Sequence, residues 1–260
     1  QYGSDAVAGV VNVILDTDEW WTERRLLARK LLDVGDVQAA YRVAREGPAP
    51  LKENSRVDQL FTAGWIALRY AKDPAAANQY FAQIAKADAH PTSLARGAYW
   101  QGRTAEALGR NDEARTHYSR GAQYPAAYYG QLARARLGGG DISLPPVPAP
   151  APDARAMLAR LEIVRAAEIL YAIEERDLVV SIAADLADRP TDPGALAMLA
   201  EVATRNQDAR TLLLIGKGAM ARGLPFELHA FPTVGLPRYT PVGPQVEPAV
   251  IYSIARQESA

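Results

Sequence analysis

Between residues 18 and 137, apolar and polar positions follow the period of an α-helix, in stretches separated by short breaks. The stretches are rich in alanine and leucine, and they lack the strict alternation that is typical of a half-buried strand. We therefore predict an all-α fold with no sheet of more than two strands, apart from a short extended piece within residues 1–15.

Three segments of this helical region resemble one another. Each begins with Asp or Asn, which favour helix N-caps, and each reaches a tyrosine. The segments are residues 36–41, 73–80 and 111–118, which start at Asp36, Asp73 and Asn111. The tyrosines Tyr41, Tyr80 and Tyr118 lie 39 and 38 residues apart. This spacing predicts one helical hairpin per repeat, with neighbouring hairpins stacked to bury their apolar faces.

The first helix of each predicted hairpin carries most of the large apolar residues. They are Leu26, Leu27 and Leu31, then Phe61, Trp65, Ile66 and Leu68, then Tyr99, Trp100, Ala107 and Leu108. In the second helix, Ala76 and Ala114 come four positions before Tyr80 and Tyr118, and so share a face with them. A stripe of Tyr and Trp can also stack on sugars, but at this spacing we assign it to the core.

Proline and glycine divide the rest of the chain. Residues 138–152 form a Pro/Gly-rich stretch that we interpret as an exposed linker, which follows a helical-repeat domain at 16–137. A second helical segment spans 153–222, with Asp177 and Asp192 as predicted N-caps. Its helices are predicted at 161–174, 177–186, 192–204 and 207–222.

Six prolines lie between residues 223 and 248, so that residues 223–247 are predicted to form an irregular linker loop. A last helix is predicted at 248–260, with Val250, Ile251 and Ile254 on its apolar side. No apolar run approaches the roughly 20 residues of a membrane-spanning helix. We therefore expect no transmembrane segment.

Charge and composition remove several functional classes. The chain has 29 basic and 30 acidic residues, a formal net charge of −1, which gives no basic footprint for nucleic acid. It has no cysteine, which excludes thiol nucleophiles and cysteine-zinc sites. His90, His117 and His229 are scattered without a second ligand at helical spacing, so we predict neither a metal site nor a cofactor. Gly216-Lys217-Gly218 fails as a phosphate loop, because glycine follows the lysine where Ser or Thr is required.

Three parts of the sequence together resemble the soluble lytic transglycosylases that cleave peptidoglycan. The first is Val-Glu-Pro-Ala at 246–249, which leads into Ile-Ala-Arg-Gln-Glu-Ser at 254–259. The second is His-Ala-Phe-Pro at 229–232, with Gly-Leu-Pro at 235–237. The third is Ala-Tyr-Trp-Gln-Gly-Arg at 98–103 with Tyr-Tyr-Gly-Gln-Leu-Ala at 128–133.

The resemblance implies a fold and an activity. The fold would be a superhelical array of helical hairpins, tetratricopeptide-like, followed at 248–260 by the first helix of a lysozyme-like catalytic domain. The activity would be cleavage of the MurNAc-GlcNAc β-1,4 bond of peptidoglycan glycan strands in the periplasm, giving 1,6-anhydromuramyl products. Glu258 would be the catalytic acid, and Ser259 would orient it. This intramolecular reaction needs no second carboxylate, unlike ordinary glycoside hydrolysis. We expect the 260 residues alone to be inactive, because the catalytic domain would be truncated after Ala260.

Two alternatives accompany this interpretation. Residues 1–15 resemble a plug-domain motif of TonB-dependent receptors and read as a strand. They are either a foreign segment joined to the chain, which we favour, or a coincidental apolar piece of the helical domain. The alternative function is a non-catalytic helical-repeat scaffold for protein partners. Residues 246–260 distinguish the two functions, because a scaffold has no need of them.

Overall fold

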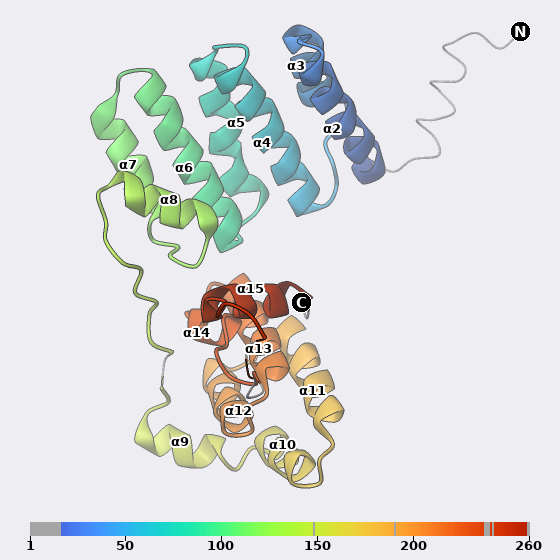
Figure 1. The fold of residues 1–260 in the computed structure, drawn as a ribbon, viewed down its shortest axis with the longest axis vertical. Coiled ribbons are helices and arrows are strands. Elements are labelled where there is room, and N and C mark those ends of the chain that lie inside the picture. The colour runs from blue at the N-terminus through green and yellow to red at the C-terminus, as the bar shows by residue number, and fades with distance from the viewer. Residues whose placement is uncertain (1–16, 148, 190, 237–239, 241, 259–260) are drawn as a thin grey trace, which may run out of the picture. The chain divides into compact units, whose positions relative to one another are not determined.

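The computed structural model describes residues 17–147, 149–189, 191–236, 240 and 242–258. Within these ranges the regular structure is helical and contains no strand, which confirms the all-α prediction (Figure 1). The segment 1–15 lies outside the described residues. The chain divides into two compact units, unit 1 (Gln1–Ile142) and unit 2 (Ser143–Ala260). None of the described helices is long and apolar enough to cross a membrane.

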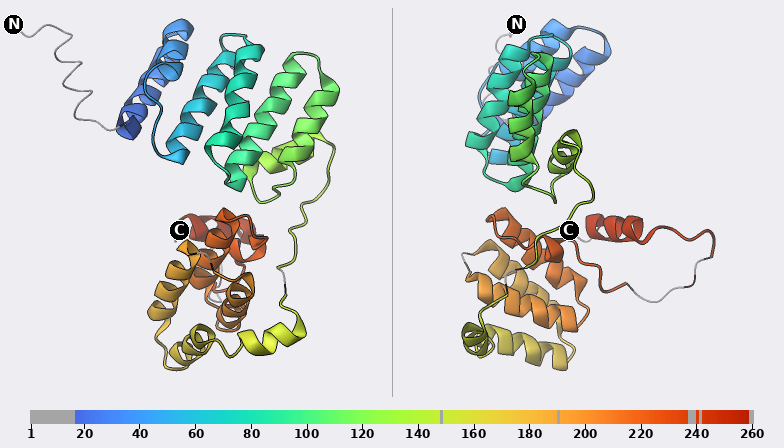
Figure 2. Two further views of the ribbon diagram at one scale, coloured as in Figure 1. Left: turned by 180° about the vertical axis from the view of Figure 1, so that it is seen from behind. Right: turned by 90° about the vertical axis from the view of Figure 1, so that its left-hand side faces the viewer.

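Unit 1 is built from helices that lie beside their neighbours in sequence (Figures 1 and 2). They are α2 (Thr17–Asp33), α3 (Val37–Arg45), α4 (Glu53–Arg69), α5 (Pro74–Ala87), α6 (Pro91–Ala107), α7 (Asn111–Gly121) and α8 (Tyr128–Arg136). The pairs α2–α3, α4–α5 and α6–α7 form hairpins, and α8 packs against α6 and α7. One hairpin therefore corresponds to each of the three similar segments.

Five helix-to-helix connections use the same turn. One residue with positive φ follows the end of the first helix, and the next residue is the N-cap of the second. The pairs are Gly35–Asp36, Lys72–Asp73, Gly109–Arg110, Glu174–Glu175 and Gln207–Asp208. In four of the five, the backbone N–H of the second residue bonds a carbonyl five positions back, as Arg110 does to Ala105 at 2.9 Å. Asp73 bonds the carbonyl of Ala67, six positions back.

This turn decides which residues cap the helices. Asp36 and Asp73 accept the backbone N–H of Ala39 and Ala76, as predicted. The predictions that Asn111 and Asp177 are N-caps are wrong. The cap position lies one residue before Asn111 and two residues before Asp177. Arg110 and Glu175 take the cap positions instead, and neither makes a side-chain cap bond. Asp192 caps its helix as predicted, by accepting from Ala195 N at 3.0 Å.

Aromatic rings pack against glycines in the core of unit 1. A Cβ on Gly64 would lie 2.7 Å from the Phe81 ring, and one on Gly102 would lie 2.5 Å from the Tyr118 ring. In both hairpins, a glycine of the first helix thus admits an aromatic ring of the second. Tyr99, Trp100 and Tyr118 of the predicted aromatic core are buried.

Three leucines that we placed in this core are exposed. The exposed fractions of Leu26, Leu27 and Leu108 are 47%, 50% and 38%. On α2 the inward face belongs instead to Trp21 and Ala28. Leu26 and Leu27 come two and one positions before Ala28, so the 100° step per residue turns them away from that face.

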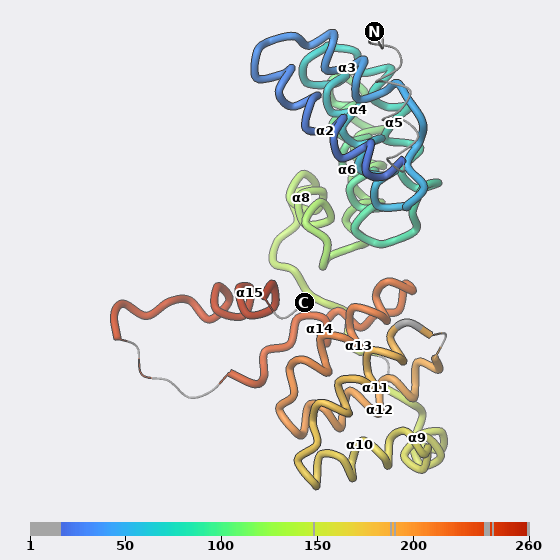
Figure 3. The backbone as a smooth tube through the Cα atoms, turned by 90° about the vertical axis from the view of Figure 1, so that its right-hand side faces the viewer, coloured from blue at the N-terminus to red at the C-terminus, as the bar shows by residue number. Residues whose placement is uncertain are grey.

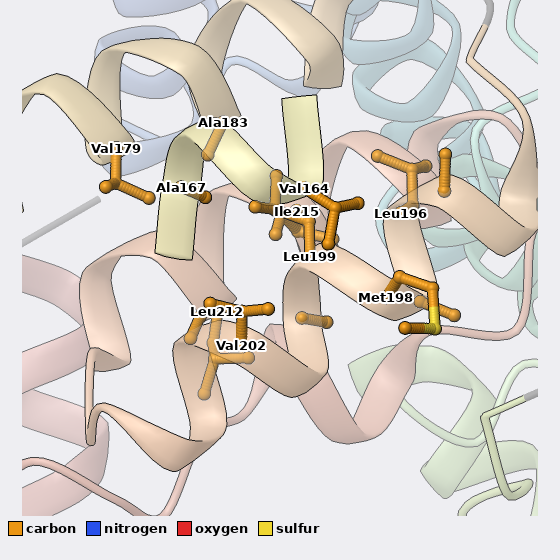
Figure 4. Packing of buried hydrophobic residues seen from close by; sticks show 14 of the residues in the cluster. Val164, Ala167, Val179, Ala183, Leu196, Met198, Leu199, Val202, Leu212 and Ile215 are labelled. Atoms are coloured by element: carbon orange, nitrogen blue, oxygen red, sulfur yellow. The ribbon is translucent and has the colours of Figure 1, made fainter. Parts of the chain in front are cut away.

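Unit 2 has a separate apolar core around α12 and α13 (Figure 4). Its helices are α9 (Pro152–Leu158), α10 (Glu162–Ala172), α11 (Arg176–Asp188), α12 (Pro193–Arg205), α13 (Ala209–Ala221), α14 (Glu227–Ala230) and α15 (Pro248–Glu258). Leu196 and Leu199 of α12 are fully buried, together with Val164, Val179 and Ile215 from the helices around it. This core holds α13 in place, and α13 in turn contacts α14.

A buried polar network ties α10 to the start of α13. The Tyr171 hydroxyl and the Thr211 hydroxyl both donate to Asp208 Oδ2 at 2.9 Å. The Thr211 backbone N–H donates to Asp208 Oδ1 at 3.1 Å, so Asp208 is also the N-cap of α13. Burial raises the pKa of Tyr171 to about 12, which keeps its hydroxyl protonated as a donor.

Candidate functional site

The predicted acid, Glu258, is the last residue of α15. Pro248 begins this helix, at a position where its missing N–H breaks no helical hydrogen bond. The helix buries none of its residues, and Val250 and Ile254 of its apolar side are 45% and 60% exposed. Glu258 is exposed, and no hydrogen bond or ion pair joins its carboxylate to another described residue. Ser259 lies outside the described residues.

Within unit 2, α15 lies beside the segment that follows α14 (Figure 3). Arg256 Nε donates to the carbonyl of Ala230 at 2.9 Å, and its guanidinium lies 4.5 Å from the centroid of the Phe231 ring. The Tyr252 hydroxyl donates to the carbonyl of Thr233 at 2.6 Å. Tyr252 and Arg256 are four positions apart, so both lie on one face of α15. These contacts bring together residues 229–233 and 248–258.

The segment 229–233 is itself fixed by α13 and α14. Phe226, the residue that precedes α14, is fully buried. A Cβ on Gly216 of α13 would lie 2.1 Å from the backbone nitrogen of Ala230. Gly216 therefore lets α14 approach α13 closely. The proline pattern predicted an irregular loop over 223–247, but α14 forms inside it because Phe226 and Ala230 are buried against α13.

Close helix packing explains why glycine occurs twice in Gly216-Lys217-Gly218. The tripeptide lies inside α13. A Cβ on Gly218 would lie 2.4 Å from the Ala187 Cβ on α11. The two glycines thus serve close contacts of α13 with α14 and α11.

The three histidines have separate surroundings. His90 Nδ1 accepts the backbone N–H of Thr92 and caps α6. Burial lowers the pKa of His117, and the charge of Arg120 lowers it further. His229 packs against Phe226 with ring centroids 5.8 Å apart, and burial lowers its pKa also. No cluster of three His, Cys, Asp or Glu side chains that could hold a metal is present in the described part of the chain.

The third motif of the sequence lies in unit 1. Residues 98–103 belong to α6 and residues 128–133 to α8, and these helices pack together with the Tyr99 and Tyr129 rings 5.4 Å apart. Trp100 is buried between them and the Phe61 ring, which lies 5.7 Å away. This motif therefore packs the two helices against each other.

A pocket of about 540 Å³ opens beside this aromatic packing. Its lining comes from α2, α4, α6 and α8, and consists of Ala28, Arg29, Leu32, Asp33, Asp58, Phe61, Thr62, Trp65, Ile66, Tyr70, Trp100 and Tyr129. Sequence reasoning missed its charged members, Arg29, Asp33 and Asp58. A signal existed, because Asp58 comes three and seven positions before Phe61 and Trp65, and so lies on their face of α4.

The chemistry open to the Glu258 carboxylate is that of a solvated group. A carboxyl becomes a general acid at neutral pH when burial disfavours its charged form. None of the described residues buries Glu258. The chain matches no protein-family model, and no match was found among curated proteins.

Proposed function

We propose that the chain carries the helical arm and the acid-bearing helix of a peptidoglycan lytic transglycosylase. The observation that supports this most is the attachment of α15 to residues 230–233 through Arg256 and Tyr252. Two of the three sequence segments that resemble this family are thereby neighbours in space.

Glu258 is the group that moves the proton in the proposed reaction. Its carboxyl donates a proton to the oxygen between N-acetylmuramic acid and N-acetylglucosamine, and the bond from that oxygen to the muramyl anomeric carbon breaks. The resulting carboxylate accepts the proton of the muramyl C6 hydroxyl, whose oxygen bonds the anomeric carbon. The product is a 1,6-anhydro ring, and Glu258 regains its proton. Ser259 orients the carboxyl, no cofactor takes part, and the substrate places the protein in the periplasm.

The test uses the full-length natural product of the gene and purified sacculi. Mass spectrometry of the digest should detect anhydromuropeptides from the wild type and a loss of about 100-fold or more in Glu258→Gln. Glu247→Gln is the matched control, because Glu247 is an exposed glutamate one position before the same helix. Circular dichroism checks that both variants fold. Full activity in Glu258→Gln would exclude Glu258 as the acid.

The 260 residues alone provide a second arm of the test. We expect them to release no anhydromuropeptides, because Glu258 is exposed in this structure and no described residue buries its carboxyl. Anhydro products from the 260-residue chain would contradict this expectation. They would not bear on the assignment of Glu258 as the acid, which the Glu258→Gln variant tests.

The alternative function is a helical-repeat scaffold without catalysis. The pocket of unit 1 favours it, because such arrays bind partners on the surface formed by successive repeats. A wild-type full-length protein that binds sacculi without releasing anhydro products would support the scaffold.

A further inference from the structure

We propose that the pocket of unit 1 is a carbohydrate-binding site for the ring of a neutral, hydroxyl-rich sugar. The site lies on α2, α4, α6 and α8, and none of its residues takes part in the reaction proposed for Glu258. It therefore goes beyond that activity. Its volume of about 540 Å³ lies within the roughly 300–1,000 Å³ of small-molecule sites, which leaves room for a short oligosaccharide.

Aromatic rings form the walls of this pocket. Trp65 and Tyr70 meet at 67° with centroids 5.1 Å apart, so they form a corner. The rings of Phe61 and Tyr129 also contact each other, with centroids 6.3 Å apart and an angle of 51° between their planes. Tyr70 is 41% exposed and the other three are partly exposed, so each ring offers surface to a ligand. Such rings contact the C–H groups of a sugar ring while excluding water.

The core behind the walls keeps them in place. Phe61 contacts Phe81 and Trp100 at centroid distances of 6.4 and 5.7 Å, and both of these rings are buried. The guanidinium of Arg96 lies 5.1 Å from the Phe61 centroid and 5.9 Å from that of Tyr129. A ligand therefore meets a preformed surface, which lowers the entropy cost of binding.

The polar groups of the pocket suit hydroxyls. Arg29 and Asp33 lie four positions apart on α2, yet neither has an ion-pair or hydrogen-bond partner among the described residues. Asp58 is held by Trp21 and Arg25, which both donate to Oδ2, and this leaves Oδ1 to accept from a ligand. A carboxylate only accepts and a guanidinium only donates, whereas a sugar hydroxyl does both.

The charge balance argues against a strongly charged ligand. The lining contains two carboxylates and one guanidinium, and Arg25 neutralises Asp58 across a 3.0 Å ion pair. An alkylammonium ligand would use the aromatic faces, but Arg96 already places a positive charge against Phe61 and Tyr129. A neutral polyhydroxyl ligand uses both the rings and the unpaired polar groups.

Isothermal titration of the 260-residue chain tests the proposal. The probes are chitotetraose, cellotetraose and a short Ala-Lys-Ala peptide; the choice of the amino-sugar probe rests on the proposed function. We expect at least one of the two sugars to bind saturably and the peptide not to bind. Glu258→Gln should bind the sugar as the wild type does, so that failure of the catalytic assignment and failure of this site remain distinguishable.

Variants locate the binding. Tyr70→Ala and Trp65→Ala should each weaken sugar binding about three- to tenfold, and Asp33→Asn should weaken it measurably. Trp20→Ala is the matched control, because Trp20 is a partly exposed tryptophan that lines a different pocket. If Trp65→Ala has a lower melting temperature than the wild type, the conclusion rests on the variants of the exposed residues Tyr70 and Asp33. No saturable binding of either sugar, unchanged affinity in Tyr70→Ala and Asp33→Asn, or binding of the peptide instead would each overturn the proposal.

Discussion

Partial burial of His229 links the stability of unit 2 to pH. Burial lowers the pKa of His229, and the nearby charge of Glu201 opposes that effect only in part. His117 in unit 1 also has a lowered pKa, because of its burial and Arg120. As pH falls below the ordinary histidine range near 6.5, the unfolded chain takes up protons before the folded one. Stability is therefore lost as pH falls and is fully present above that range.

Urea unfolding at pH values between about 7.5 and 5.5 measures this effect. We expect the free energy of unfolding to decrease across the range, and His229→Gln to flatten the part of the curve that reports unit 2. His117→Gln should flatten the part that reports unit 1. An unchanged pH dependence in the double variant would show that carboxylates, and not these histidines, cause it.

At this scale, residues whose roles depend on near neighbours were predictable. Asp36, Asp73 and Asp192 cap helices as predicted, because a cap bond reaches only three residues along the chain. Asn111 and Asp177 fail, because the preceding turn sets where each helix begins. The role of Glu258 stays a prediction, because it depends on groups that would surround the carboxylate.

The shared hairpin turn predicts a stabilising substitution at the start of α7. Arg110 occupies the cap position that Asp36, Asp73 and Asp208 fill elsewhere, but it makes no cap bond. Arg110→Asp should raise the free energy of unfolding by about 0.5–1.5 kcal/mol, by satisfying an N–H of the first turn. Urea unfolding measures the gain.

Arg110→Ala is the control for this prediction. It removes the exposed Arg110–Glu113 ion pair of 3.4 Å without adding a cap, and such pairs contribute little. We expect nearly wild-type stability from it. If the aspartate variant is no more stable than the alanine variant, the turn does not position a cap there.

Close packing of α13 and α14 predicts a destabilising substitution. Gly216→Ala places a Cβ 2.1 Å from the backbone nitrogen of Ala230, which cannot move without displacing α14. We expect a loss of about 1–3 kcal/mol, and faster hydrogen exchange over residues 226–233. α15 should exchange faster too, because Arg256 bonds to Ala230.

Gly140→Ala is the matched substitution. A Cβ on Gly140 meets nothing within 4 Å and the residue has no positive φ, so the change should stay within about 0.5 kcal/mol. Equal melting of the two variants would contradict the close approach of α14 to α13. Hydrogen exchange detected by mass spectrometry would then show whether residues 226–233 are held at all.

At the scale of the molecule, the two units predict where proteases cut. The boundary lies between Ile142 and Ser143, within the Pro/Gly-rich segment 138–152 that we interpret as a linker. Arg134 bonds the carbonyls of Gly140 and Asp141, and Val147 packs against the core of unit 2. Residues 142–146 lie between these attachments. Limited digestion with thermolysin should cut there first and leave two resistant fragments.

Helix α6 is the internal control for cleavage of the linker in that digest. Its tyrosine, tryptophan and glycine positions are buried, so residues 94–108 should resist cleavage while the linker is cut. N-terminal sequencing and intact mass identify the cut sites. Early cleavage within α6, with residues 138–152 intact, would show that the boundary between the units is wrong.

The sequence by itself determined the helices, the hairpin period and most of the breaks, because helical periodicity, caps, glycine and proline act within a few residues. The tertiary structure decided which face of α2 is inside, since Leu26 and Leu27 are exposed whereas Ala28 is buried. It also decided that α14 forms in a proline-rich stretch, that residues 229–233 meet α15, and that Phe61 and Trp65 line a pocket. Those outcomes depend on contacts between residues far apart in the chain, such as Gly216 with Ala230, which no local pattern encodes.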